Sequence, residues 1–67
     1  MDIGKSLKTI RQLNKLTQSE LALKTNIKQQ NISRWEANIH MPNIEECIKL
    51  ADFYGVSLDE LIDRIIK

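Results

Sequence analysis

Three consecutive amide side chains, Gln29, Gln30 and Asn31, stand at the start of a short polar segment. A Gln or Asn side chain carries a hydrogen-bond donor and an acceptor at a fixed spacing. That pair matches the N6 donor and N7 acceptor of adenine in the major groove of DNA, so one amide can contact this base through two hydrogen bonds. Arg34, four residues after Gln30, can pair with guanine or bind a phosphate. A run of amides on a small helix is often only a solvated face, and without the surrounding motif that interpretation is favoured.

The apolar residues around these amides predict a helix that presents them together. Ile32 and Trp35 are three residues apart, so a helix over about 29–37 directs both inward and the amides outward. Trp35 could stack on a base, but its spacing from Ile32 favours packing against neighbouring helices.

Three further segments begin with a capping residue that is followed three positions later by Glu, a pattern typical of a helix start. The pairs are Thr17 with Glu20, Asn43 with Glu46, and Ser57 with Glu60. They predict helices at about 18–25, 43–54 and 58–66, and Thr17 and Ser57 are expected to form complete capping boxes. A first helix follows from four apolar residues at helical spacing: Ile3, Leu7, Ile10 and Leu13.

The second and third predicted helices are joined by only three residues, Asn26, Ile27 and Lys28. A sharp turn of this length needs a residue that tolerates left-handed dihedral angles, and Asn is among the few besides Gly that do. Ile27 is then expected to point into the angle between the two helices. This is helix-turn-helix geometry, and the sequence shows no strand pattern that would compete with it.

The composition limits the classes of function. The chain has 67 residues, one Cys and one His, too few for a disulfide framework or a four-ligand zinc site. Cys47 is expected in the core, and His40 in an exposed loop. The net charge of +1 hides an asymmetry. Residues 1–41 carry seven basic and three acidic side chains, or +4, whereas residues 42–67 carry three basic and six acidic ones, or −3. This division suggests a molecule with one basic end, and solvated helix faces of mixed sign are the alternative that charge alone leaves open.

Several other functions find no support in the sequence. No nucleophile stands at a recognisable spacing from a base and there is no glycine-rich phosphate loop, so we expect no enzyme and no cofactor. No secretory signal and no apolar run of membrane-spanning length is present. The expected location is the cytoplasm, without a membrane partner, and no small-molecule effector is indicated.

Taken together, these motifs carry a family resemblance. The segment LTQSELALKTNIKQQNISRWEAN, from Leu16 to Asn38, with Pro42 and then GVSLDEL from Gly55 to Leu61, resembles the phage-repressor and Cro-like helix-turn-helix family, often called the XRE family. The resemblance covers nearly the whole chain. It implies an all-α fold, a compact five-helix bundle of the lambda-repressor-like type, over residues 1–67, with the helix-turn-helix at about 17–37. It also implies a dimer that binds double-stranded DNA with the third helix in the major groove.

The resemblance, with the chemistry of the side chains, gives each candidate residue a role. The predicted base-contacting residues are Gln29, Gln30 and Arg34, with Asn31 and Ser33 at the edge of the same face. The predicted phosphate-contacting residues are Gln18, Lys28 and Asn38. The family also implies an ion pair between Arg11 and Glu36, which we expect at the surface with a worth of only about 0 to 1 kcal/mol.

The chain departs from the usual family pattern at several positions. Asn26 and Asn38 replace common glycines, which is tolerable if both adopt left-handed dihedral angles. Lys28 occupies the N-cap of the third helix, where Ser or Thr is usual, at a cost on the order of 1 kcal/mol that a bound phosphate could offset. The loop of Ile39, His40 and Met41 lacks the basic residues often found there, which weakens the case for phosphate contacts from this loop.

The last predicted helix carries more apolar residues than so small a domain can bury. We expect part of the set to form a dimer interface, made of Leu58, Ile62, Ile65 and Ile66. The predicted function is therefore a transcriptional regulator, a repressor that occupies a palindromic operator as a homodimer. Two alternatives remain open: an antitoxin-like or other protein-interaction module, and the DNA-binding fragment of a longer regulator.

Overall fold

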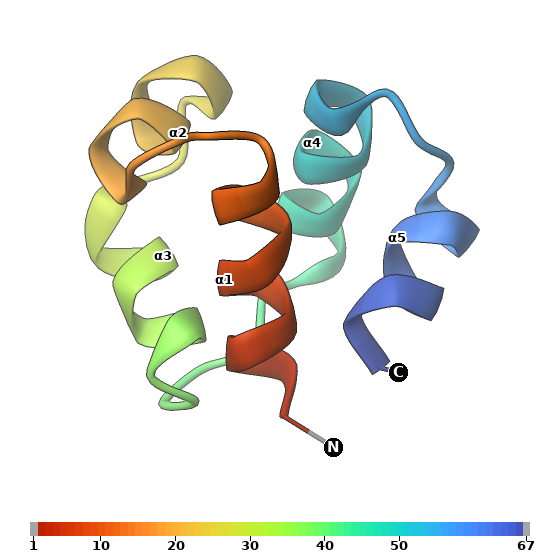
Figure 1. Ribbon diagram of the computed structural model, residues 1–67, viewed down its shortest axis with the longest axis horizontal. Helices are drawn as coiled ribbons and strands as arrows, with labels where there is room; N and C mark the ends of the chain where they lie inside the picture. The colour runs from red at the N-terminus through yellow and green to blue at the C-terminus, as the bar shows by residue number, and fades with distance from the viewer. Residues whose placement is uncertain (1, 67) are drawn as a thin grey trace.

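The computed structural model describes residues 2–66, which form five helices joined by short connections (Figure 1). The helices are α1 (Ile3–Leu13), α2 (Gln18–Thr25), α3 (Gln29–Glu36), α4 (Ile44–Tyr54) and α5 (Leu58–Ile66). No strand occurs within residues 2–66. The predicted all-α fold is confirmed, and the predicted helix ends differ from the observed ones by at most one residue.

The helices begin where the capping residues predict. At the start of α2, the Glu20 amide donates to Thr17 Oγ1 at 3.1 Å, and the Thr17 amide donates to Glu20 Oε1 at 2.9 Å. The same reciprocal bonds join Asn43 and Glu46 at the start of α4. The sequence predicted only the hydrogen bond from the Glu46 amide to Asn43, because the complete capping box is typical of Ser and Thr caps. Each cap satisfies amides that the first helical turn leaves without partners.

The turn between α2 and α3 has the predicted conformation. Asn26 ends α2 with φ of 58°, in the left-handed region, and Ile27 is buried with 4% of its surface exposed. Asn38 adopts the same left-handed conformation after α3, with φ of 60°. Lys15, between α1 and α2, also has φ of 58°. Nothing in its residue type predicts this, since Lys rarely occupies that region.

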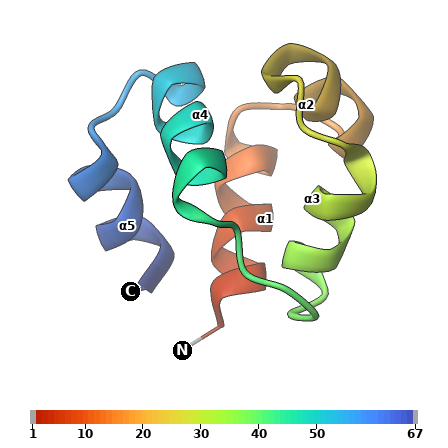
Figure 2. The ribbon, with the colours of Figure 1, turned by 180° about the vertical axis from the view of Figure 1, so that it is seen from behind.

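Helix α1 lies at the centre of the fold, with α2 and α3 on one side and α4 and α5 on the other (Figures 1 and 2). Helices α4 and α5 run in opposite directions, and the second half of α5 lies near the start of α1, where Arg64 and Asp2 line one depression (Figures 1 and 2). The core between them includes the predicted Ile32, Trp35 and Cys47. Its other buried members are Leu7, Ile10, Leu21, Ile27, Leu50, Ala51, Leu61 and Ile65. None of the described helices is long and apolar enough to cross a membrane.

The start of α1 contacts the end of α3 backbone to backbone. A Cβ atom placed on Gly4 would lie 2.6 Å from the Trp35 carbonyl oxygen and 2.7 Å from that of Glu36. It would also lie 2.8 Å from Oδ1 of Asn38, which accepts a hydrogen bond from the Gly4 amide at 2.9 Å. Because real Cβ atoms do not approach so closely, only Gly allows α1 and α3 to meet at this point.

The predicted interface on α5 needs correction. Ile65 is only 3% exposed and belongs to the core, so it offers no surface to a partner. Leu58 and Ile62 are half-buried and pack against the same core, whereas Ile66 is 46% exposed. The core is deeper than the chain length suggests, because α1 and α4 both pack on α5.

Candidate nucleic-acid interface

Four of the five predicted base-contacting residues lie together on α3. Gln29, Gln30, Ser33 and Arg34 are exposed and line one shallow depression, and we call these four residues the α3 outer face. None of the four side chains makes a hydrogen bond or ion pair with another residue in the range 2–66. Their donors and acceptors are therefore free for an external ligand. Ile32 and Trp35, on the opposite side of α3, are buried and hold the helix on the core.

Gln18, predicted to contact phosphate, shares the depression of the α3 outer face. It stands in the first turn of α2, where free backbone amides favour anions. Its Nε2 donates to Glu36 Oε1 at 3.1 Å, which fixes the side chain beside α3. A neighbouring depression adds Lys15 and Ser19 to Gln18 and Gln29. Neither Lys15 nor Ser19 was predicted from the sequence. Lys15 could have been, because it is a basic residue two positions before the N-cap of α2, where an anion would bind.

Lys28 caps α3 without a hydrogen bond from its side chain, as its residue type predicts. A Lys cannot accept from the free amides of the first turn, and its charge stands at the positive end of the helix dipole. The side chain is exposed and lies with Gln29 and Ser19 around a third depression. Lys15, Lys28 and Arg34 thus place positive charge around the α3 outer face, in agreement with the basic first part of the chain.

Asn31 lies apart from the α3 outer face. It is half-buried, and its Nδ2 donates to Glu46 Oε2 at 3.3 Å, across the gap to α4. The other carboxylate oxygen of Glu46 is held by the capping box of α4. Asn31 therefore joins α3 to α4. One of its two amide N–H donors is used in this way, and the predicted contact of Asn31 with a base stays a prediction.

Asn38, predicted to contact phosphate, makes two hydrogen bonds within the protein. Its Oδ1 accepts from the Gly4 amide, and its Nδ2 donates to Asp2 Oδ1 at 2.9 Å. The hydrogen bonds from Asn38 and from the Lys5 amide hold the pKa of Asp2 below its ordinary value. Asn38 thus holds the junction of α1 and α3, and the Asp2 carboxylate beside it would repel a phosphate, so its phosphate contact stays a prediction.

The Arg11–Glu36 ion pair is present, but it is buried and not at the surface as expected. Its side chains are only 9% and 6% exposed. Arg11 Nε donates to Glu36 Oε2 at 2.7 Å, and Nη2 donates to Oε1 at 2.8 Å. The Nη1 group donates to the Leu16 carbonyl oxygen at 2.7 Å. The pair thus ties α1, the start of α2 and the end of α3 together around Gln18.

Comparison with known families gives one match that covers most of the chain. Residues 7–61 match the family HTH_3, described as helix-turn-helix. The matched range contains α2 and α3 and every residue of the α3 outer face. No solved structure matches the chain.

Curated relatives include regulators of transcription. The chain is 39% identical over 64 residues to the HTH-type transcriptional regulator ImmR of Bacillus subtilis, covering 96% of this chain and 50% of that protein. It is 32% identical over 62 residues to the HTH-type transcriptional activator BcrR of Enterococcus faecalis, covering 92% and 30%. It is 41% identical over 58 residues to Multiprotein-bridging factor 1 of Candida albicans, covering 87% and 38%. The chain thus spans half or less of the length of each of these relatives.

Proposed function

Because this chain belongs to the XRE family of helix-turn-helix proteins, we propose that it binds double-stranded DNA sequence-specifically through α3 and regulates transcription. One observation carries the proposal. Four exposed polar side chains without internal partners gather on the α3 outer face, beside Gln18 and the amino end of α2. In this motif the second helix of the pair enters the major groove and the first crosses the backbone, which suits these two groups of residues.

Within this proposal the regulator is a repressor that occupies a palindromic operator as a homodimer, in the cytoplasm. Repression by occupancy needs only a DNA-binding face, and a two-fold dimer requires two half-sites about 34 Å apart, one turn of DNA. Selection of bound sites from a random duplex library tests this. Recovery of a palindrome with that spacing is expected, and a library that stays random after selection contradicts sequence-specific binding. A reporter gene placed behind the selected site distinguishes repression from activation.

The two glutamines at the start of α3 are expected to determine which sequence is bound. Gln29→Ala or Gln30→Ala should cost about 1 to 3 kcal/mol on the selected site and little on random DNA, because only base contacts depend on sequence. Affinities for the two duplexes, measured at equal salt, give the ratio directly. Asp59→Ala removes an exposed polar side chain from α5, across the molecule from α3, and should leave this ratio unchanged. Equal losses on both duplexes for the Gln29 and Gln30 variants would show that these residues do not contact bases.

Lys28→Ser is expected to raise stability and to weaken DNA binding. A Ser at the N-cap of α3 accepts from the free amides of the first turn and should stabilise the fold by about 1 kcal/mol. Loss of the Lys charge should weaken binding to all sequences and reduce the slope of log affinity against log salt by about one. Urea unfolding and binding at several salt concentrations measure the two effects. Lys24→Ser, in the last turn of α2, is the control and should neither raise stability nor change the salt slope. An unchanged salt slope for Lys28→Ser would exclude a phosphate contact by Lys28.

A further inference from the structure

Helices α4 and α5 leave isoleucines uncovered. On α4, Ile44 is 65% exposed and Ile48 is 45% exposed, one turn apart on the same side. On α5, Ile66 is 46% exposed, and Ile62, one turn earlier, is half-buried. Isolated exposed apolar residues are common, but several on adjoining surfaces indicate an interaction site.

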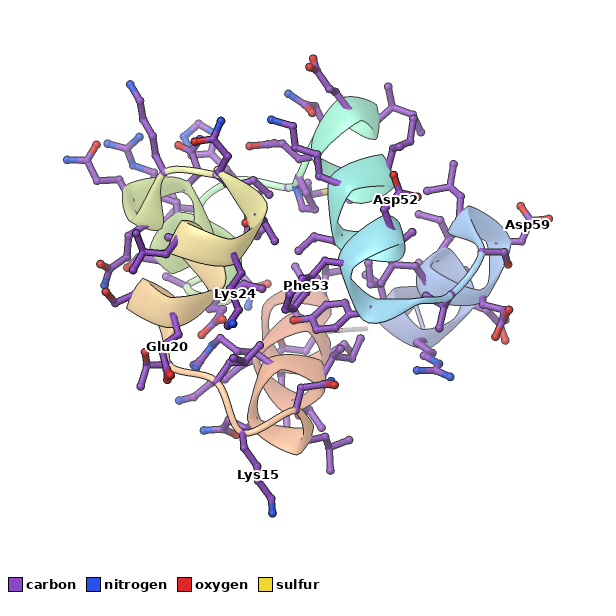
Figure 3. All side chains as sticks on the ribbon, turned by 90° about the horizontal axis from the view of Figure 1, so that it is seen from above. Lys15, Glu20, Lys24, Asp52, Phe53 and Asp59 are labelled. Carbon is purple, nitrogen blue, oxygen red and sulfur yellow. The ribbon has the colours of Figure 1, made fainter. Side chains whose placement is uncertain are left out.

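The exposed isoleucines of α4 lie on the flank that faces away from α2 and α3. The opposite flank carries Glu46, which accepts a hydrogen bond from Asn31 of α3, and Phe53, which lies on the side of α4 toward α1 and α2 in Figure 3. Asp52, four residues after Ile48 and therefore on its side of the helix, lies on the outer side of α4 in the same view. Ile44 and Ile48 share this outer side.

The isoleucines of α5 lie on the flank that faces away from α1. Arg64 lines a depression with residues of α1, so its flank of α5 faces that helix. Ile62 and Ile66 are on the other flank, toward α4, which packs on α5. Helices α4 and α5 run in opposite directions, and the first half of α4 lies level with the first half of α5, while the end of α5 extends past the start of α4 (Figures 1 and 2). Ile44, Ile48 and Ile62 thus border one outer surface, and Ile66 extends it along the end of α5; we call these four residues the isoleucine face.

We propose that the isoleucine face binds the same face of a second copy of this chain about a two-fold axis. This inference rests on the proposed function, which requires a homodimer, and it moves the interface from the α5 strip predicted from sequence. Exposed charges on α4 indicate a second copy as the partner. Glu45 and Lys49 are one turn apart, and neither has an ion-pair partner among residues 2–66. A two-fold axis that passes between Glu45 and Lys49 would place Glu45 of one copy opposite Lys49 of the other, and the reverse.

The dimensions of the fold suit this arrangement. The helices span 24 × 24 × 22 Å, and α3 lies across the molecule from α5 (Figure 1). Two copies joined through the isoleucine face therefore hold their α3 helices on far sides, more than one molecular width apart. That distance is compatible with the separation of about 34 Å between successive major grooves on one face of DNA. Joining two copies through the loop that directly follows α3 would bring the α3 helices closer together.

Sedimentation equilibrium on the full chain without DNA tests the interface. Ile48→Lys should weaken the dimer about a hundredfold or more, because it places a charge in an apolar contact. The side chain is largely exposed, so the helical content measured by circular dichroism should not change. Leu13→Lys, at a residue 76% exposed on α1, is the matched control and should dimerise like the unmodified chain. An Ile48→Lys chain that dimerises normally, or an unmodified chain that stays monomeric at millimolar concentration, overturns the proposal.

A charge exchange tests the position of the axis. Glu45→Lys alone or Lys49→Glu alone should weaken the dimer about tenfold, since each variant places like charges opposite one another. The double variant Glu45→Lys/Lys49→Glu restores opposite charges across the axis and should recover most of the loss. Additive losses in the double variant would overturn the two-fold pairing of α4.

Binding to a duplex with a single half-site separates this inference from the proposed function. Ile48→Lys should bind one half-site as tightly as the unmodified chain and lose affinity only on the complete palindrome. The added charge is positive, so it cannot weaken binding by repelling phosphates. Equal loss on the half-site and the palindrome would show that Ile48 acts elsewhere than at a dimer interface. A chain that dimerises through this face but selects no sequence would contradict the proposed function alone.

Discussion

Glu36→Gln is expected to destabilise the domain by about 3 to 5 kcal/mol, because it leaves the Arg11 guanidinium buried without its counter-charge. The loss is large against a total stability on the order of 3 to 10 kcal/mol for a chain of this length. The ion-pair side chains are 9% and 6% exposed, and both carboxylate oxygens accept from Arg11. Urea unfolding, followed by circular dichroism, measures the change.

Removing both charges distinguishes the destabilisation caused by an unpaired buried ion from the net contribution of the ion pair to stability. In the double variant Arg11→Met/Glu36→Leu no charge is left buried, so it should be more stable than Glu36→Gln. If Glu36→Gln costs less than about 1 kcal/mol, the pair behaves as an exposed one and the burial described here is wrong.

The same ion pair should make the stability of the protein depend on pH in the acid range. Burial acts to raise the pKa of Glu36, but the hydrogen bonds from Arg11 and Gln18 and the charge of Arg11 outweigh it, so the pKa lies below its ordinary value of 4.5. The folded state then binds fewer protons than the unfolded state. The stabilisation is complete above about pH 4.5 and is lost as the pH falls through the lowered pKa. Unfolding between pH 2 and 7 should show a shallower acid dependence for Glu36→Gln than for the unmodified chain.

Ile65→Glu is expected to unfold the domain, with a cost above about 4 kcal/mol, because it buries an unpaired carboxylate. Ile65 is 3% exposed and packs in the same core as Leu61, which is 1% exposed. Loss of helical circular dichroism at neutral pH measures the effect.

The neighbouring residue provides the control for this variant. Ile66→Glu introduces the same charge one position later, at a side chain 46% exposed, and should leave the fold intact. A folded Ile65→Glu chain would mean that α5 does not pack on the core as described.

Much of the fold could be predicted because its signals are local. Thr17 and Asn43 each bond to a residue three positions away, so the starts of α2 and α4 depend on a few neighbouring residues. The α3 outer face is similarly local, since helical spacing alone places Gln29, Gln30, Ser33 and Arg34 opposite Ile32. The family of the chain followed from the same short segments.

The errors concern contacts between residues far apart in the sequence. Helical spacing indicates that Ile62, Ile65 and Ile66 share one side of α5, but the position of α4 decides which of them is buried. Likewise, Arg11 and Glu36 were paired correctly, but their burial depends on how α1 and α3 meet. The bond between Asn38 and Gly4, 34 positions apart, likewise has no signature in the sequence.

The contact at Gly4 also bears on how readily such a protein could change its target. The end of α3 is positioned through backbone carbonyl groups, and its inner side through Ile32 and Trp35. The side chains of the α3 outer face take no part in holding the helix. Mutations there can therefore accumulate without a large loss of stability. Divergent copies of this chain could acquire new operators by exchanging a few surface residues, while Gly4 stays unchanged.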